Sequence, residues 1–324
     1  MRTKTTIAFG LLLSFIVAST MGCGAGAFNR FHVAAATVAA ATQEPARADK
    51  KSDSNSNPRQ DDNAPPIHFE TYTIRGAKSL AALEAKYGKD ALEIMLKLNR
   101  VDRRHVGNGT KVILPAEKTD LLALAPFPAE LEMISSVGKM ILVSRQVQAF
   151  GAYESGRLVY WGPTSTGKMA SPSPTGLYFT NWRAKETRSS INSSWRLPWY
   201  FNLDNIRGVA FHQYDLPGVP ASHGCVRLLE QDAQWVFNWA EQWILTSERN
   251  SIAAYGTPVL IFGDYAYGAQ PPWKQLTEDA RAASVTMADV EAALKKHMPT
   301  VEARIEARRS LVAATVQVDA NSTR

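Results

Sequence analysis

A strand-like stretch that ends in a histidine and then turns back to a cysteine is the feature that most restricts how this chain can fold. The stretch "GVAFH" (208–212) is apolar, and the connection "QYDLPGVPAS" (213–222) contains two prolines and a glycine, which favour turns over a helix. The chain therefore doubles back after His212. We expect the turn "SHGC" (222–225) to lie beside the end of that strand, with His212 facing Cys225.

Cys225 has neighbours suited to a nucleophilic thiol. An ordinary thiol, with a pKa of about 8.5, is mostly protonated at neutral pH, so a base must take its proton before it attacks a carbonyl carbon. We predict that His212, on a rigid strand, is this proton acceptor and donor, and that His223 shapes the site or is the alternative base. Ser222 and Gly224 are predicted to form the turn whose N–H groups hold an oxyanion.

Other interpretations of the cysteine are weaker. A buried, inert cysteine beside a hydrogen-bonded histidine is the simplest alternative. The chain has two cysteines and no Cys-x-x-Cys or His-x-x-x-His spacing, so we predict no metal; that no cofactor is needed is implied only by the family resemblance described below. The net charge of +6 indicates anionic wall polymers or lipid headgroups, or only solubility, rather than nucleic acid.

The N-terminus is typical of an exported protein. Arg2 and Lys4 precede an apolar run (7–18) that is shorter than the ~20 residues of a membrane-spanning helix, and small residues follow, so we predict a signal peptide over 1–27. Cys23 in "STMGCGAG" stands where a bacterial lipoprotein carries its acylated cysteine; it is either a membrane tether or lost with the signal. Residues 28–66 are predicted to be a flexible linker, because 37–66 lack aromatic residues and apolar periodicity.

Residues 67–117 show a strand, two helices and a strand in sequence. Apolar residues at helical spacing in 80–87 and 92–98 lie between strand-like segments near Tyr72 and at 112–114. The segment resembles a LysM module, a small glycan-binding domain. The resemblance rests on Tyr72, Ile74, Leu80, Tyr87-Gly88, Leu98-Asn99, Gly109 and Leu114-Pro115. Ala77-Lys78 replaces the family's Gly-Asp pair beside the sugar groove, and a purely structural helix pair is the alternative.

From residue 128 the pattern predicts a mainly β domain that ends at 264. Short aliphatic or aromatic stretches at 139–144, 146–153, 157–167 and 257–262 are typical of strands, and one helix is expected over 230–243. Beyond it, 265–324 is predicted to be a helical extension with helices at 287–297 and 301–316, to which we assign no function.

The string from His212 to Arg227 resembles the active-site motif of the L,D-transpeptidases, bacterial cell-wall enzymes. In that family a histidine is followed, a little over ten residues later, by Ser-His-Gly-Cys, a small aliphatic residue and Arg; here these are His212 and 222–227. Further likeness lies in "TSTG" (164–167), "SPTGLYFT" (173–180), "PWYFN" (198–202) and Asp232-Ala233. The resemblance implies a β-sandwich catalytic domain with one helix after the cysteine.

The resemblance also implies a reaction and a location in the bacterial envelope, in the periplasm or the wall. The Cys225 thiolate attacks a peptidoglycan tetrapeptide stem, D-alanine leaves, and the thioester passes to an amine, giving 3→3 cross-links. A wall-attached protein, a D-amino acid or water is an alternative acceptor. The Gln213 carbonyl is expected to orient His212, and Arg227, Trp199 and Tyr200 are candidate substrate contacts. The alternatives are an inactive wall-binding protein, or a carboxypeptidase or endopeptidase that uses the same cysteine and histidine.

Overall fold

A computed structural model describes the backbone of residues 67–322 and the side chains of 67–317 of this 324-residue chain. The predicted signal peptide (1–27), the candidate acylation site Cys23 and the predicted linker (28–66) lie outside the described residues. Within 67–322, no helix combines the length and the apolar character needed to cross a membrane.

Residues 67–117 form a strand, two helices and a strand, in the order predicted from the sequence. The two strands pair antiparallel, with Tyr72 opposite Val112. The first helix stops at Gly88, whose φ of 80° is a conformation that side chains disfavour. Its identity as a LysM module stays a prediction. The elements are β1 (Phe69–Thr73), α1 (Ala77–Tyr87), α2 (Ala91–Asn99) and β2 (Lys111–Pro115).

A nine-stranded sheet forms the following part of the chain, with strands in the order β6-β13-β3-β4-β5-β10-β9-β8-β7. Neighbouring strands run antiparallel except for the pairs β13–β3 and β10–β9, which are parallel. The strands are β3 (Lys139–Ser144), β4 (Ala149–Glu154), β5 (Arg157–Ser165), β6 (Gly176–Phe179), β7 (Arg183–Arg188), β8 (Arg196–Asp204), β9 (Val209–Gln213), β10 (Val226–Leu228) and β13 (Pro258–Phe262).

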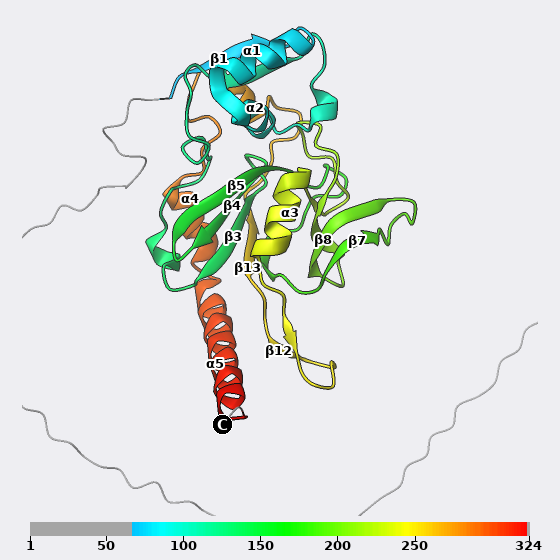
Figure 1. Cartoon of the computed structure of the whole chain (residues 1–324), viewed down its shortest axis with the longest axis vertical. Coiled ribbons are helices and arrows are strands. Elements are labelled where there is room, and N and C mark those ends of the chain that lie inside the picture. Colours follow the sequence, from blue (N-terminus) through cyan, green and yellow to red (C-terminus); the bar gives the residue numbers. More distant parts are fainter. Residues whose placement is uncertain (1–66, 323–324) are drawn as a thin grey trace, which may run out of the picture. The chain divides into compact units, whose positions relative to one another are not determined.

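The sheet curls around a core that it shares with the helix α3 (Glu230–Trp239). Apolar side chains from β3 and β4, from β8, β9 and β10, and from α3 belong to one buried cluster, and Figure 1 shows α3 between β3–β5 and β8. The predicted β-sandwich is therefore correct in that two groups of strands face a common core. It is wrong in that hydrogen bonds join them into one continuous sheet.

The predicted helix over 230–243 ends early, at Trp239. Ala240 takes an extended conformation with ψ of 150°, and the next amide, that of Glu241, donates to Thr257 Oγ1 at 2.9 Å. The contact with the segment before β13 replaces the next turn of helix. Residues 244–245 and 252–254 then form a two-stranded hairpin, β11 (Ile244–Leu245) and β12 (Ile252–Ala254).

The C-terminal part is helical, as predicted, but with different bounds. Thr286 and Asp289 form a reciprocal capping box at the start of α4 (Met287–Leu294), and α5 (Met298–Ser322) follows. Val290, Leu294 and Val301 are fully buried in a cluster with residues of β3 and β4, so both helices pack on the sheet.

Candidate active site

The two parallel strands β9 and β10 bring the histidine and the cysteine to one face of the sheet. Phe211 is the register partner of Val226, and His212 is the partner of Arg227. Because side chains alternate along a strand, Phe211 and Val226 face the core with α3, whereas His212 and Arg227 face the other way. Cys225, the residue before β10, packs against a cluster that includes Ala210 of β9, two residues before His212 and on the same face.

The Cys225 thiol is protonated at neutral pH in this structure. The residue is half-buried, and its Sγ donates a hydrogen bond to the carbonyl oxygen of Gly208 at 3.2 Å. Burial raises the pKa of the thiol to about 11, against the smaller lowering effects of a hydrogen bond with the Ala210 backbone and of the Arg227 charge. A base is therefore needed to generate the nucleophile at neutral pH.

His212 is buried, and its ring is held in one orientation. Its Nδ1 lies 3.0 Å from the carbonyl oxygen of Gln213, the contact expected from the sequence. A carbonyl only accepts, so Nδ1 carries the proton and Nε2 has a free lone pair. Burial lowers the pKa of His212 to about 4, with a raising effect of the Gln213 carbonyl and a lowering effect of Arg227. The imidazole is thus neutral at pH 7 and able to accept a proton.

Ser222 and Gly224 shape the turn that carries the thiol. Ser222 Oγ donates to the carbonyl oxygen of Cys225 at 2.6 Å and accepts from the Gly224 amide at 3.1 Å. Gly224 has a φ of 121°, which other residues rarely adopt, and the space around its missing side chain is open. The Gly224 amide is thus already used inside the turn.

The turn is fastened to the segment that follows β5. The Ser222 amide donates to Thr166 O, and the Lys168 amide donates to Ser222 O, both at 3.0 Å. Buried Ser173 adds a second attachment, since its Oγ donates to Gly224 O at 2.8 Å and accepts from the Gly167 amide at 2.9 Å. The sequence motifs "TSTG" and "SPTG" contain Thr166, Gly167 and Ser173 but not Lys168, and their spacing alone does not show that they support the thiol.

His223 is exposed, whereas His212 is buried. Its Nε2 is 2.9 Å from Lys168 Nζ, and its ring centroid is 5.1 Å from that of Trp195. Partial burial, followed by the Lys168 and Arg227 charges, lowers the pKa of His223. The ammonium group of Lys168 can only donate a hydrogen bond, so Nε2 of His223 is the acceptor in this contact.

The three candidate substrate contacts divide between the two faces of the sheet. Tyr200 belongs to the apolar cluster that includes Cys225, and Arg227 projects from the same face, half-buried, with its Nη1 3.2 Å from Asp215 O. Trp199 instead belongs to the core cluster beneath α3, where its ring meets Phe237 edge-on at 5.5 Å. The structure therefore does not bring Trp199 to the candidate site.

One group among the described residues has the composition of a metal site. Asp102, His105 and Asp215 place their ligand atoms within 4.8 Å of one another. However, Nη2 of Arg104 lies 2.9 Å from Asp102 Oδ2 and 3.3 Å from Asp215 Oδ1. The guanidinium of Arg104 thus already pairs with both carboxylates, so the geometry does not support a metal ion at this group.

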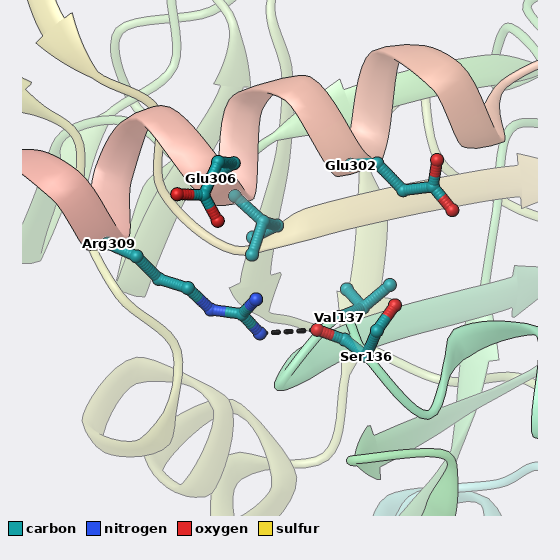
Figure 2. A pocket seen from close by; sticks show the side chains of 6 residues that line it. Ser136, Val137, Glu302, Glu306 and Arg309 are labelled. Atoms are coloured by element: carbon teal, nitrogen blue, oxygen red, sulfur yellow. Dashed lines mark hydrogen bonds between the residues drawn. The ribbon is translucent and has the colours of Figure 1, made fainter. Parts of the chain in front are cut away.

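Two surface hollows lie apart from the thiol. One, between Ser136–Val137 and α5, is lined by Glu302, Glu306 and Arg309, and Figure 2 shows Arg309 reaching the Ser136 carbonyl oxygen. The other is an apolar groove between the β11–β12 hairpin and residues 311–316 of α5. Neither contains a residue of the Cys225 cluster.

Residues 138–261 match the model of the YkuD family, the L,D-transpeptidase catalytic domain. The matched segment runs from the residue before β3 to within β13 and includes His212 and the turn at 222–225. This part of the chain is therefore similar to that catalytic domain, in agreement with the resemblance of its sequence motif. No curated protein matches the chain.

Solved structures of L,D-transpeptidases are similar to 38–40% of the chain. The protein from Stackebrandtia nassauensis is 21% identical with a TM-score of 0.32, over 40% of this chain and 57% of that one. The Mycobacterium smegmatis protein is 15% identical with a TM-score of 0.31, over 39% and 59%. The catalytic domain from Enterococcus faecium is 20% identical with a TM-score of 0.30, over 38% and 96%. The chain thus spans less than two thirds of the first two proteins.

Proposed function

We propose that residues 128–264 form a cysteine-dependent L,D-transpeptidase that acts on peptidoglycan peptide stems. The observation that supports the proposal is that Cys225, the residue before β10, packs on the face of the sheet to which His212 of the parallel strand β9 belongs, with His212 Nδ1 bound to the Gln213 carbonyl. This leaves Nε2 as the acceptor for the thiol proton. The match of 138–261 to the L,D-transpeptidase catalytic domain supports the substrate class.

The proposed acylation begins from a neutral pair. When a tetrapeptide stem enters, Nε2 of His212 takes the proton of Cys225 as the sulfur attacks the carbonyl carbon at the L-centre of the diamino acid. The C–N bond to the terminal D-alanine breaks, and the imidazolium returns the proton to the leaving amine. The product is a thioester on Cys225 and free D-alanine.

The second half of the reaction transfers the acyl group. The amine of a second stem attacks the thioester, His212 accepts the excess proton of that amine, and the proton goes to the departing sulfur. The new amide is a 3→3 cross-link. A wall-attached protein, a D-amino acid or water in the acceptor position gives protein attachment, exchange or carboxypeptidase activity at the same residues.

The turn before the thiol is the proposed oxyanion site. The Gly224 amide already donates to Ser222 Oγ. We therefore propose that the amide of Cys225 donates to the carbonyl oxygen on which negative charge develops. Arg227 and Tyr200 lie on the same face as the thiol and are proposed to contact the stem. His223, which is exposed and next to Lys168, is proposed to shape the rim of the site.

The rest of the chain fits a wall-associated enzyme. We propose that residues 67–117 form a LysM module that binds glycan strands, supported by the β1-α1-α2-β2 order with β1 and β2 paired. Export by the signal at 1–27, and a lipid on Cys23 as a membrane tether, are proposed on the sequence alone. The proposed location is the bacterial envelope, in the periplasm or the wall.

Acylation by a carbapenem tests the enzyme proposal. The purified mature chain is incubated with the compound, and its mass is followed. A single adduct is expected on the wild type and none on Cys225→Ala, with His212→Ala acylated at least about a hundredfold more slowly. An unmodified wild type, or an adduct that survives Cys225→Ala, would overturn the enzyme proposal, and the unmodified wild type would favour the inactive wall-binding alternative. Loss of acylation in His223→Ala but not in His212→Ala would reverse the two histidine roles.

Defined tetrapeptide muropeptides separate the possible reactions. Cross-linked dimers with release of D-alanine are expected from a transpeptidase. Tripeptides alone would identify a carboxypeptidase, and cleavage within existing cross-links would identify an endopeptidase.

A further inference from the structure

The loop that connects His212 to Cys225 is held by the N-terminal segment that precedes the catalytic domain. The amide of Asp102 donates to Leu216 O at 3.0 Å, and the Leu216 amide donates to Asp102 Oδ2 at 2.9 Å. Val101 and Pro217 form an isolated antiparallel bridge beside them. The loop is thus bound through its backbone, as an added strand would be.

Further contacts fix the same stretch of loop. The Nε2 of His105 lies 2.8 Å from Asp215 Oδ1, and Arg104 Nη2 lies 3.3 Å from the same oxygen. The Leu216 side chain is fully buried in an apolar cluster shared with residues of α1 and α2. Backbone, ionic and apolar contacts therefore converge on two consecutive loop residues.

These loop residues connect directly to the candidate site. The carbonyl oxygen of Asp215 accepts from Nη1 of Arg227 at 3.2 Å, and the Arg227 guanidinium carbon lies 4.6 Å from the ring centroid of Tyr214. The Tyr214 ring meets the His212 ring edge-on at 5.8 Å. Arg227 is also the register partner of His212. A shift of the loop would therefore move groups that touch the base.

We propose that Asp102 is a positioning residue for the reaction at Cys225. Its backbone and carboxylate hold Leu216, and through the loop they hold Tyr214 and Arg227 against His212. This inference rests on the proposed transpeptidase function and adds to it that the N-terminal module completes the geometry of the catalytic site. The module then has a role in the chemistry besides any contact with glycan.

The carboxylate of Asp102 is suited to this position. Burial raises its pKa, but hydrogen bonds from the Arg104 side chain and from the amides of Leu216 and Arg104 outweigh that effect and hold the pKa below its usual range. The group is therefore ionised at neutral pH. Charge-assisted bonds of this kind are about twice as strong as neutral ones.

Three variants test the role of Asp102. Asp102→Ala removes the acceptor of the Leu216 amide, Asp102→Asn keeps an oxygen there, and Arg103→Ala changes an exposed side chain on the same turn as the matched control. The maximal rate of carbapenem acylation and the half-saturating concentration are measured on the full mature chain, together with the unfolding midpoint in urea. We expect Asp102→Ala to lower the maximal rate about tenfold to a hundredfold, Asp102→Asn to restore most of it, and Arg103→Ala to match wild type.

The outcomes separate positioning from plain stability. A folded Asp102→Ala protein that acylates at the wild-type rate, whatever its unfolding midpoint, would overturn the inference. So would equal rates in Asp102→Ala and Asp102→Asn. If Asp102→Ala does not fold, Arg104→Ala/His105→Ala gives the second measurement, since it removes exposed side chains that hold Asp215. We expect about a two- to fivefold loss of rate from it, and no loss would count against the proposal.

A wild-type chain that does not react would test the proposed function and not the role of Asp102. If the wild-type chain forms no adduct, the proposed function itself fails. If the wild type reacts and all variants react equally, only the role of Asp102 fails.

Discussion

Lys97 and Asp232 form a completely buried ion pair, with Lys97 Nζ on α2 lying 3.2 Å from Asp232 Oδ1 on α3. The same Nζ donates to Trp161 O at 2.7 Å, and the hydroxyl of Tyr160 donates to Asp232 Oδ1 at 2.7 Å. Burial raises the pKa of Asp232 to about 6, although Lys97 and the Tyr160 hydroxyl lower it. The helix that follows the candidate nucleophile is therefore tied to the N-terminal module by charges that water does not reach.

Removing both members of this pair is expected to cost less than the sum of the two single removals. Lys97→Met leaves the buried carboxylate of Asp232 without an opposite charge, so it should lower the free energy of unfolding by about 3–5 kcal/mol at pH 7. Asp232→Asn should cost less, because Lys97 Nζ keeps its ion pair with Glu93 at 2.9 Å. The double variant should lose clearly less than the sum, as measured by urea unfolding. Lys86→Met is the control, since its pair with Glu70 is exposed and contributes less than about 1 kcal/mol. Additive losses would contradict the coupling.

The buried His212 predicts a loss of stability in mild acid. Its pKa is about 4 when folded and about 6.5 when unfolded, so the unfolded chain binds the proton more tightly. This contribution to stability is complete above pH 6.5 and is lost as the pH falls through 4, by about 3 kcal/mol in total. The raised pKa of Asp232 acts in the opposite direction over the same range, with stability lost as the pH rises through about 6.

Comparison of variants isolates the histidine. The difference in unfolding free energy between wild type and His212→Asn, measured from pH 7 to pH 4, should change by about 3 kcal/mol, because Asp232 contributes equally to both proteins. His223→Ala should follow the wild-type pH dependence more closely than His212→Asn does, because the pKa of His223 is also lowered but its ring is exposed, so its contribution has the same sign and is smaller. A constant difference between wild type and His212→Asn would show that His212 is not held neutral by burial.

The Cys225 thiol is expected to react slowly with a simple alkylating agent. With a pKa of about 11, only about one molecule in 10⁴ carries the thiolate at pH 7, so iodoacetamide alkylation should rise about tenfold per pH unit up to about pH 11. Carbapenem acylation should instead be nearly constant from pH 6 to 9, because His212 removes the proton during attack. Rapid, pH-independent alkylation near pH 7 would indicate a preformed thiolate–imidazolium pair.

The segment that supports the thiol turn has no space for a side chain at Gly167. A Cβ there would lie 2.0 Å from Ser171 O and 2.5 Å from the amide nitrogen of Ser173. Gly167→Ala should therefore displace Ser173 from Gly224, lower the unfolding free energy by about 1–3 kcal/mol and slow acylation. Gly107→Ala, where nothing lies within 4 Å, is the control and should match wild type in both measurements. Wild-type acylation by folded Gly167→Ala would show that this segment does not position the turn.

Local patterns were sufficient to predict several elements of the fold. The apolar run 139–144 is a strand with those bounds, because its residues are buried between β13 and β4. The run at 146–153 begins later, at Ala149, since Gln148 has a φ of 48° and its backbone carbonyl and side-chain amide bind the Thr164–Thr166 segment. The turn residues between His212 and Cys225 were sufficient to predict that the chain doubles back after His212.

Long-range contacts of charged residues were not predictable in the same way. Lys97 and Arg100 lie in a helical pattern that suggests solvent exposure, yet both are fully buried, with Arg100 Nε donating to Val147 O at 3.0 Å. Nothing near them in sequence specifies those partners. By contrast, strand alternation alone would have separated Trp199 from Tyr200, since adjacent residues of β8 face opposite sides.

The hydrogen bond from Cys225 Sγ to Gly208 O has a consequence for the chain outside its reaction cycle. Peroxides and other oxidants attack the thiolate, and a thiol held protonated with a pKa of about 11 offers them almost none. Cys225 is the free cysteine of the described region, so an irreversible sulfinic or sulfonic acid there would inactivate the site. In the proposed mechanism the sulfur ionises only when a substrate arrives beside His212, so the resting protein is expected to keep this thiol unoxidised.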